Sequence, residues 1–175
     1  ITTLMGLGAF PGNHPLWLGM PGMHGTVAAN RAIHHADVIL AIGLRFDDRV
    51  TGKVSRFAPH AHTIIHVDID PAEIGKVVRT HIPIVGDSRL VLKELLKGAR
   101  ALRLAAWWRE LEEWRTRYPL RYRPKPHLQS QEVIRAFYEA TGGHAIVTTG
   151  VGQHQMFAAQ FFPVTRPRSF LTSGG

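Results

Sequence analysis

Glycine and aspartate follow three apolar runs of the chain, at points where they could meet a ligand. The runs and the residues that end them are Val38–Ile42 with Gly43, Thr63–Val67 with Asp68, and Ile82–Val85 with Gly86 and Asp87. If the runs are neighbouring parallel strands, their carboxyl ends share the sheet edge where such sheets bind ligands. Glycine permits close backbone approach, and a carboxylate can accept hydrogen bonds from ribose hydroxyls. Turn formation is the alternative at any one position, but three in succession favour a nucleotide-bearing cofactor.

Two further segments carry residue types suited to binding. Gly19–Thr26 precedes an expected helix, whose free N–H groups could face a flavin or its phosphates. The alternative is a flexible loop with methionine packed in the core. Arg45–Arg49 is a charged cluster that is either a solvated loop with internal ion pairs or an arginine beside a cofactor phosphate. Gly6–Gly12 is rich in glycine but lacks the GxGxxG spacing.

Several other chemistries are disfavoured by the residues present. His34, His35, His60 and His62 lack a third ligand at a recognisable spacing, so no metal site is expected in this chain. Cysteine is absent, which excludes disulfides and thiolate metal sites. The chain also lacks a Gly-x-Ser-x-Gly elbow, which disfavours covalent hydrolase chemistry.

Composition is that of a soluble globular protein. The chain has 175 residues, 45% of them hydrophobic and 19% charged, and no apolar run of membrane-spanning length. Its formal charge is +8, of which nine Lys/Arg against three Glu between Lys97 and Lys125 supply +6. Without an aromatic stacking platform or a helix-turn-helix pattern, we interpret this stretch as a basic linker face and expect no nucleic-acid or membrane partner.

The elements that must position these residues indicate an α/β fold. Residues 1–98 alternate β-branched runs with helical patterns at 24–36 and 88–96, which predicts a Rossmann-like parallel sheet covered by helices on both faces. Residues 1–4 read as a strand. Residues 99–127 form a connector with an amphipathic helix at 101–118, followed by three prolines that mark a boundary.

Residues 128–175 predict the start of a second α/β unit. We expect a helix capped by Ser130, strands at 145–149 and 169–172, and a helix at 153–162 between them. These elements are too few to bury a sheet, so the unit is incomplete as given. We therefore expect it to expose Phe157, Phe161 and Phe162.

Five strings of the sequence carry a family resemblance. They are Gly19-Met20-Pro21-Gly22-Met23-His24-Gly25-Thr26, Arg45-Phe46-Asp47-Asp48-Arg49-Val50-Thr51-Gly52-Lys53, Val67-Asp68-Ile69-Asp70, Glu73-Ile74-Gly75-Lys76 and Val151-Gly152-Gln153-His154-Gln155-Met156. Over essentially its whole length the chain resembles the large catalytic subunits of acetolactate (acetohydroxyacid) synthases, a family of thiamine-diphosphate enzymes. Pro21 departs from the leucine that many relatives carry.

The resemblance implies a subunit of three domains and a set of binding residues. Residues 1–98 would be the C-terminal part of a central FAD-binding domain, 99–127 the connector, and 128–175 the start of the thiamine-diphosphate-binding domain. The implied FAD contacts are Thr3, Leu4, Pro21, Gly22, Met23, His24, Gly43, Leu44, Arg45, Phe46, Asp47, Asp68, Ile69, Gly86 and Asp87. Gln153 and His154 would bind thiamine diphosphate, and Asp48 and Arg49 would line the substrate channel. The activating glutamate and the Mg2+ ligands would lie outside this chain.

The resemblance also implies an activity. It is thiamine-diphosphate-dependent decarboxylation of pyruvate and carboligation to a second 2-oxoacid, pyruvate or 2-oxobutyrate, in branched-chain amino-acid biosynthesis. We expect a cytoplasmic homodimer or tetramer with a small regulatory subunit, and no activity from this chain alone. Two alternatives stay open: another flavin-linked thiamine-diphosphate enzyme, similar to pyruvate oxidase, or a non-catalytic nucleotide-binding module.

Overall fold

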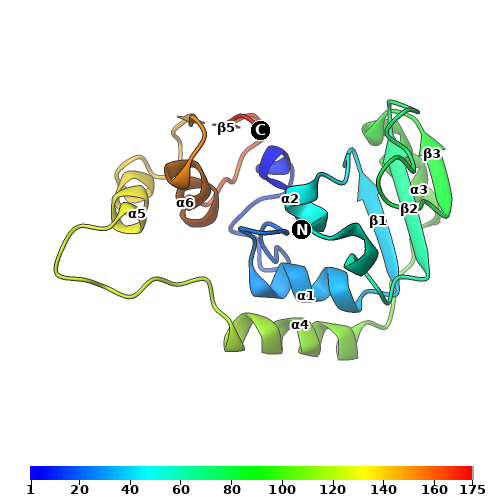
Figure 1. The fold of residues 1–175 in the computed structure, drawn as a ribbon, viewed down its shortest axis with the longest axis horizontal. Helices are drawn as coiled ribbons and strands as arrows, with labels where there is room; N and C mark the ends of the chain where they lie inside the picture. Colours follow the sequence, from blue (N-terminus) through cyan, green and yellow to red (C-terminus); the bar gives the residue numbers. More distant parts are fainter. Residues whose placement is uncertain (175) are drawn as a thin grey trace. The chain divides into compact units, whose positions relative to one another are not determined.

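The computed structural model describes residues 1–174, so Gly175, the last residue of the expected second α/β unit, lies outside the described residues. Tertiary contacts divide the chain into two compact units, which Figure 1 shows in ribbon form. Unit 1 consists of Ile1–Ala29 and Trp114–Gly175, and unit 2 consists of Asn30–Glu113. Each contains a parallel pairing of strands.

The sheet of unit 2 is parallel, as predicted. Its strands are β1 (Val38–Ile42), β2 (Thr63–Asp68) and β3 (Ile82–Val85), in that spatial order. Ile42 pairs with Val67, and Asp68 pairs with Val85, so the carboxyl ends of the strands lie in register. Because β2 has a neighbour on both edges, it is the most buried strand, and helix α3 (Ser88–Gly98) packs against it.

Three helices begin at a short polar side chain that satisfies a free backbone N–H. These are α1 (Val27–His35), α2 (Asp48–Thr51) and α3. The pairs are Thr26 with Ala29 N at 3.1 Å, Asp47 with Arg49 N at 2.9 Å, and Asp87 with Leu90 N at 3.1 Å. A 3-10 turn (Val54–Arg56) follows α2, and the connector helix α4 spans Ala105–Arg117.

In unit 1, helices α5 (Ser130–Ala140) and α6 (Gln153–Phe161) pack together, and β4 (Val147–Thr148) pairs with β5 (Phe170–Leu171). The core joins the beginning of the chain to these elements. Its buried members are Leu7, Met20, Ala158, Ala159, Phe162, Val164 and Phe170. The expectation that Phe162 is exposed is therefore wrong: the side chain is 3% exposed, because residues 4–20 supply apolar cover that local periodicity does not reveal. Phe157 and Phe161 are half-buried, not exposed.

Two other expectations for unit 1 are corrected. The strand predicted at residues 1–4 is absent, because the chain turns into a 3-10 helix (Leu4–Gly6) in which Gly6 N donates to Thr3 O at 2.9 Å. Helix α5 is capped by Gln129 and not by Ser130. Its first turn is closed by a hydrogen bond from Gln129 N to the Glu132 carboxylate at 2.9 Å.

Among residues 1–174, no helix combines the length and the apolar character needed to span a membrane.

Candidate functional site

Unit 2 brings the strand-end residues to one edge of its sheet. Gly43 N donates to Val67 O at 2.8 Å, and Gly86 N donates to Asp68 O at 2.9 Å. Gly43, Asp68 and Gly86 therefore follow three adjacent parallel strands at their carboxyl ends. This is the arrangement on which the prediction of a nucleotide-bearing cofactor depends.

The backbone at Gly43 is open to an approaching group. A Cβ atom added there would meet nothing within 4 Å, and its φ of +60° favours glycine. At Gly86 the space is tighter, since a Cβ would lie 3.2 Å from Val91 Cγ2. A flat or phosphate-bearing ligand can thus reach the main chain at Gly43 with no side chain in the way.

The carboxylates at this edge also stabilise the local fold through hydrogen bonds and an ion pair. Asp47 caps α2 and pairs with Arg45 at 2.6 Å, which agrees with internal ion pairing in the charged cluster. Asp68 and Asp87 each accept one backbone hydrogen bond through Oδ1, from Asp70 N and Leu90 N respectively. In the described part of the chain neither uses Oδ2, so each retains an acceptor for a hydroxyl group.

Phe46 and Ile69, two other predicted FAD contacts, differ sharply in exposure. Phe46 is 1% exposed and belongs to the core of unit 2, with its ring edge-on to His66 at 5.0 Å. Ile69 is 70% exposed, directly after β2. Leu44 is half-buried against the same core as Phe46. The predicted channel residues Asp48 and Arg49 begin α2 and are exposed.

In unit 1, the predicted contacts Pro21–His24 form a compact turn. Gly25 N donates to Gly22 O at 3.0 Å, and Thr26 N donates to Met20 O at 2.9 Å. A Cβ on Gly25 would lie 2.2 Å from Met20 O, so only glycine fits. Met20 is 6% exposed, which agrees with the interpretation that methionine of this segment packs in the core. Met23 is 72% exposed, so its side chain is accessible to a ligand. Thr3 and Leu4 are half-buried in the same unit.

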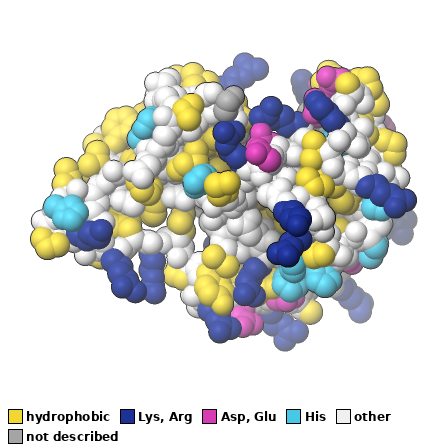
Figure 2. All heavy atoms as spheres, in the orientation of Figure 1, with side chains coloured by type: hydrophobic (Ala, Val, Ile, Leu, Met, Phe, Trp, Pro, Cys, Tyr) yellow, Lys and Arg dark blue, Asp and Glu magenta, His cyan; other side chains and the backbone are white. Residues whose placement is uncertain are grey.

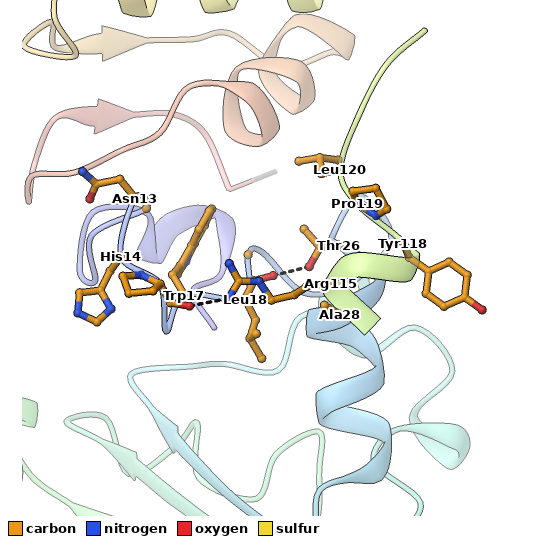
Figure 3. Close-up of a pocket in the computed structure, with 13 residues that line it drawn as sticks. Asn13, His14, Trp17, Leu18, Thr26, Ala28, Arg115, Tyr118, Pro119 and Leu120 are labelled. Atoms are coloured by element: carbon orange, nitrogen blue, oxygen red, sulfur yellow. Dashed lines mark hydrogen bonds between the residues drawn. The ribbon is translucent and has the colours of Figure 1, made fainter. Parts of the chain in front are cut away.

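A cavity of about 380 Å³ lies beside this turn in unit 1 (Figure 3). Thr26 closes one side by donating to Leu18 O at 2.6 Å, and Arg115 donates to Pro15 O at 2.6 Å. Trp17, also in its lining, donates through its indole to Thr2 Oγ1 at 2.9 Å. None of the predicted cofactor residues lines this cavity, so it is separate from the predicted contacts.

The predicted thiamine-diphosphate residues follow a glycine turn at the start of α6. Gly152 has φ +145° and ψ −167°, a conformation almost confined to glycine. A Cβ there would lie 3.3 Å from the His154 ring, so the absence of a side chain lets the imidazole fold over the turn. Gln153 and His154 are exposed. Since the first N–H groups of a helix have no partner within it, this end suits an anion such as a diphosphate.

The residue that sequence reasoning missed is Gln155. Its side chain is 3% exposed and donates through Nε2 to Thr172 Oγ1 at 2.7 Å and to Ser173 O at 2.8 Å. It lies in the Val151–Met156 string, but nothing in the string distinguishes a buried glutamine from the exposed Gln153 two residues earlier.

Histidines gather in unit 2, and histidine side chains also lie on the face seen in Figure 2. The rings of His34, His35 and His60 have centroids 5.0 to 5.7 Å apart, and those of His35 and His60 are stacked. Within residues 1–174 no group of three or more His, Cys, Asp or Glu is placed to hold a metal ion.

Two features of the structure are typical of a cofactor-binding α/β protein: a parallel sheet with glycine and aspartate at its carboxyl edge, and a glycine turn before helix α6. Residues 1–95 match the family described as thiamine pyrophosphate enzyme, central domain. The chain therefore belongs to the thiamine pyrophosphate enzymes.

Individual relatives are acetolactate synthase large subunits. The chain is 48% identical over its whole length to the acetolactate synthase isozyme 3 large subunit of Escherichia coli (strain K12), covering 32% of that protein. It is 50% identical over its whole length to the acetolactate synthase large subunit of Corynebacterium glutamicum, covering 29%. Over 99% of the chain it is 47% identical to the acetolactate synthase large subunit of Buchnera aphidicola subsp. Schlechtendalia chinensis, covering 32%. The chain thus spans about a third of the length of these relatives.

Proposed function

We propose that this chain is part of the large, catalytic subunit of an acetolactate synthase. The complete subunit would decarboxylate pyruvate and join the remaining two-carbon unit to a second 2-oxoacid, pyruvate or 2-oxobutyrate, in branched-chain amino-acid biosynthesis. The observation that carries this proposal is the identity of 47 to 50% to acetolactate synthase large subunits along essentially the whole chain.

In this proposal, the chain contributes to two cofactor sites. Residues 1–98 form the later part of a central FAD-binding domain, 99–127 the connector, and 128–175 the start of the thiamine-diphosphate-binding domain. The open backbone at Gly43 and the spare oxygens of Asp68 and Asp87 fit a flavin nucleotide. The glycine turn and N–H groups at the start of α6, with Gln153 and His154, fit a diphosphate.

Thiamine diphosphate, when bound, supplies the carbanion chemistry of the reaction. The residues of this chain would hold and orient it. The first N–H groups of α6 would donate to phosphate oxygens, and Gln153 and His154 would add side-chain donors beside them. Asp48 and Arg49, exposed at the start of α2, stand as substrate-channel residues, with the arginine suited to a 2-oxoacid carboxylate.

The remaining partners belong to the same proposal. Mg2+ would be held by ligands outside this chain. The complete subunit would assemble as a homodimer or tetramer with a small regulatory subunit in the cytoplasm.

The activity is tested on the subunit encoded by the complete gene. Purified with thiamine diphosphate, Mg2+ and FAD, it should form acetolactate from pyruvate and lose that activity when thiamine diphosphate is withheld. The isolated chain of residues 1–175 should form none. Bleaching of the flavin by pyruvate without acetolactate would indicate a pyruvate oxidase-like enzyme. Binding of an adenine nucleotide with no thiamine dependence would indicate a non-catalytic module.

The FAD site is tested with a matched pair of glycine substitutions in the complete subunit. Gly43→Ala places a methyl group on the open backbone, whereas Gly52→Ala adds one at φ +59°, where it also meets nothing within 4 Å. Both substitutions carry the same left-handed backbone strain of about 1–2 kcal/mol, so we expect only Gly43→Ala to lower bound FAD, by at least ~10-fold, and Gly52→Ala to retain the flavin. The measurement is the visible absorbance of FAD per subunit after gel filtration, and equal retention in the two variants contradicts the assignment.

A further inference from the structure

Gln155 is a buried polar side chain next to exposed ones. It is 3% exposed, and the other buried residues of α6 are Ala158 and Ala159. A buried amide is costly unless its hydrogen bonds are made. Here the amide N–H groups are used, since Nε2 donates to Thr172 Oγ1 at 2.7 Å and to Ser173 O at 2.8 Å.

The hydrogen bonds of Gln155 are extended through Thr172, after β5, to Thr149, after β4. Thr172 and Thr149 share a hydrogen bond of 2.6 Å between their hydroxyl groups, and Thr149 N donates to Leu171 O at 3.0 Å. Thr149 directly follows β4, and Thr172 directly follows β5. Gln155 therefore fastens α6 to the carboxyl ends of both strands of unit 1.

This arrangement fixes the glycine turn at its two ends. The segment Gly150–Gly152 leaves Thr149, which is held by Thr172, and enters α6, which is held through Gln155. The turn itself has two glycines and an exposed Val151, so no buried side chain of its own anchors it. The direction of the N–H groups at the start of α6 thus depends on the anchors at either end.

We propose that Gln155 is a positioning residue for the diphosphate group of the cofactor. It does not touch the cofactor itself; it aligns the start of α6 and the segment after β5 so that both face the anion together. A carboxylate of the same size could not replace the amide, because Nε2 donates to both the Thr172 hydroxyl and the Ser173 carbonyl and an ionised carboxylate has no donor. The inference rests on the proposed function, which places thiamine diphosphate at this helix.

The test uses the complete subunit and a matched substitution. Gln155→Leu removes both hydrogen bonds at similar size, and Gln131→Leu makes the same change on α5, where Gln131 is half-buried. Three quantities are measured: the Kd of the apo-enzyme for thiamine diphosphate, kcat at saturating cofactor, and bound FAD. We expect Gln155→Leu to raise the Kd ~10- to 100-fold, as outer-shell partners do in metal sites, while kcat at saturation falls less and FAD is retained. Gln131→Leu should match the wild type.

A second variant keeps the test decisive if Gln155→Leu fails to fold. Thr172→Val has nearly the same shape and replaces only the hydroxyl group with a methyl group, and it should raise the same Kd. In the double variant the two effects should be less than additive, because both remove one shared network.

An unchanged Kd in the folded variants overturns the inference, as does a parallel loss of FAD and thermal stability with no specific change in Kd. Measuring the wild-type subunit distinguishes a failure of the proposed function from a failure of the role assigned to Gln155. If the wild-type subunit itself binds no thiamine diphosphate, the proposed function fails; if it binds normally and the variants bind equally well, only the role of Gln155 fails.

Discussion

His66 on β2 is a buried polar side chain of unit 2 whose hydrogen-bonding groups are unsatisfied. It is 0% exposed, and neither ring nitrogen has a hydrogen-bond partner among the described residues. One neighbour is the ring of Phe46, which contributes an edge-to-face contact and no polar atom. A buried imidazole without partners reduces stability by the cost of removing it from water.

We therefore expect His66→Leu to leave the free energy of unfolding unchanged or to raise it by about 1 kcal/mol, because it removes that cost and fills similar space. His66→Ala should lower it by about 2–4 kcal/mol, since the core loses volume. Urea denaturation of both variants beside the wild type measures the two changes. A loss above about 2 kcal/mol in the leucine variant is incompatible with this account.

At the scale of elements, the aspartates after the strands link the sheet to its helices. Asp87 illustrates the double use of such a residue, because it follows β3 and caps α3. An N-cap side chain contributes about 1 kcal/mol through the free N–H that it satisfies.

Asp87→Ala should lower the free energy of unfolding by about 1 kcal/mol, whereas Asp87→Asn should lose little because its carbonyl oxygen still accepts from Leu90 N. Thermal or urea unfolding gives the stability of each variant. Equal losses in both would mean that charge, and not capping, is what this position contributes.

The elements of unit 2 could be predicted from sequence because their causes are local. Val38–Ile42, Thr63–Val67 and Ile82–Val85 are β-branched runs ended by glycine or aspartate, and the rule for parallel strands placed those ends at one edge. The packing of Leu7 and Met20 against α6 could not be predicted, because no periodicity relates residues so far apart in the chain. The same limit hid Gln155, whose burial is a property of the folded unit.

At the scale of the whole molecule, we expect the histidine cluster to make stability depend on pH. His34 is an exposed residue, yet partial desolvation lowers its pKa below the ordinary value of 6.5, and the nearby His35, His60 and Arg31 lower that pKa further. Because the folded state binds this proton less readily than the unfolded state, the contribution is fully present above the unfolded pKa. It is lost as the pH falls through the folded pKa.

Urea unfolding from pH 7.5 to 5 should therefore give a free energy of unfolding that declines toward acid, and His34→Gln should reduce the slope. His62→Gln is the matched control, because His62 is likewise exposed and its side chain hydrogen-bonds only Thr63 among the described residues. If the slope is the same in wild type and His34→Gln, the cluster does not carry the effect.

The shared core of unit 1 has a consequence for synthesis on the ribosome. Leu7 and Phe162 belong to one cluster, yet all of unit 2 is translated between them. At about 5–20 residues per second, on the order of ten to thirty seconds pass between the synthesis of Leu7 and that of Phe162. Unit 2, whose strands are consecutive, can form its sheet during that interval. The nascent segment around Leu7 and Met20, with these apolar side chains not yet covered by α6, is then a part of the chain that we expect chaperones to bind.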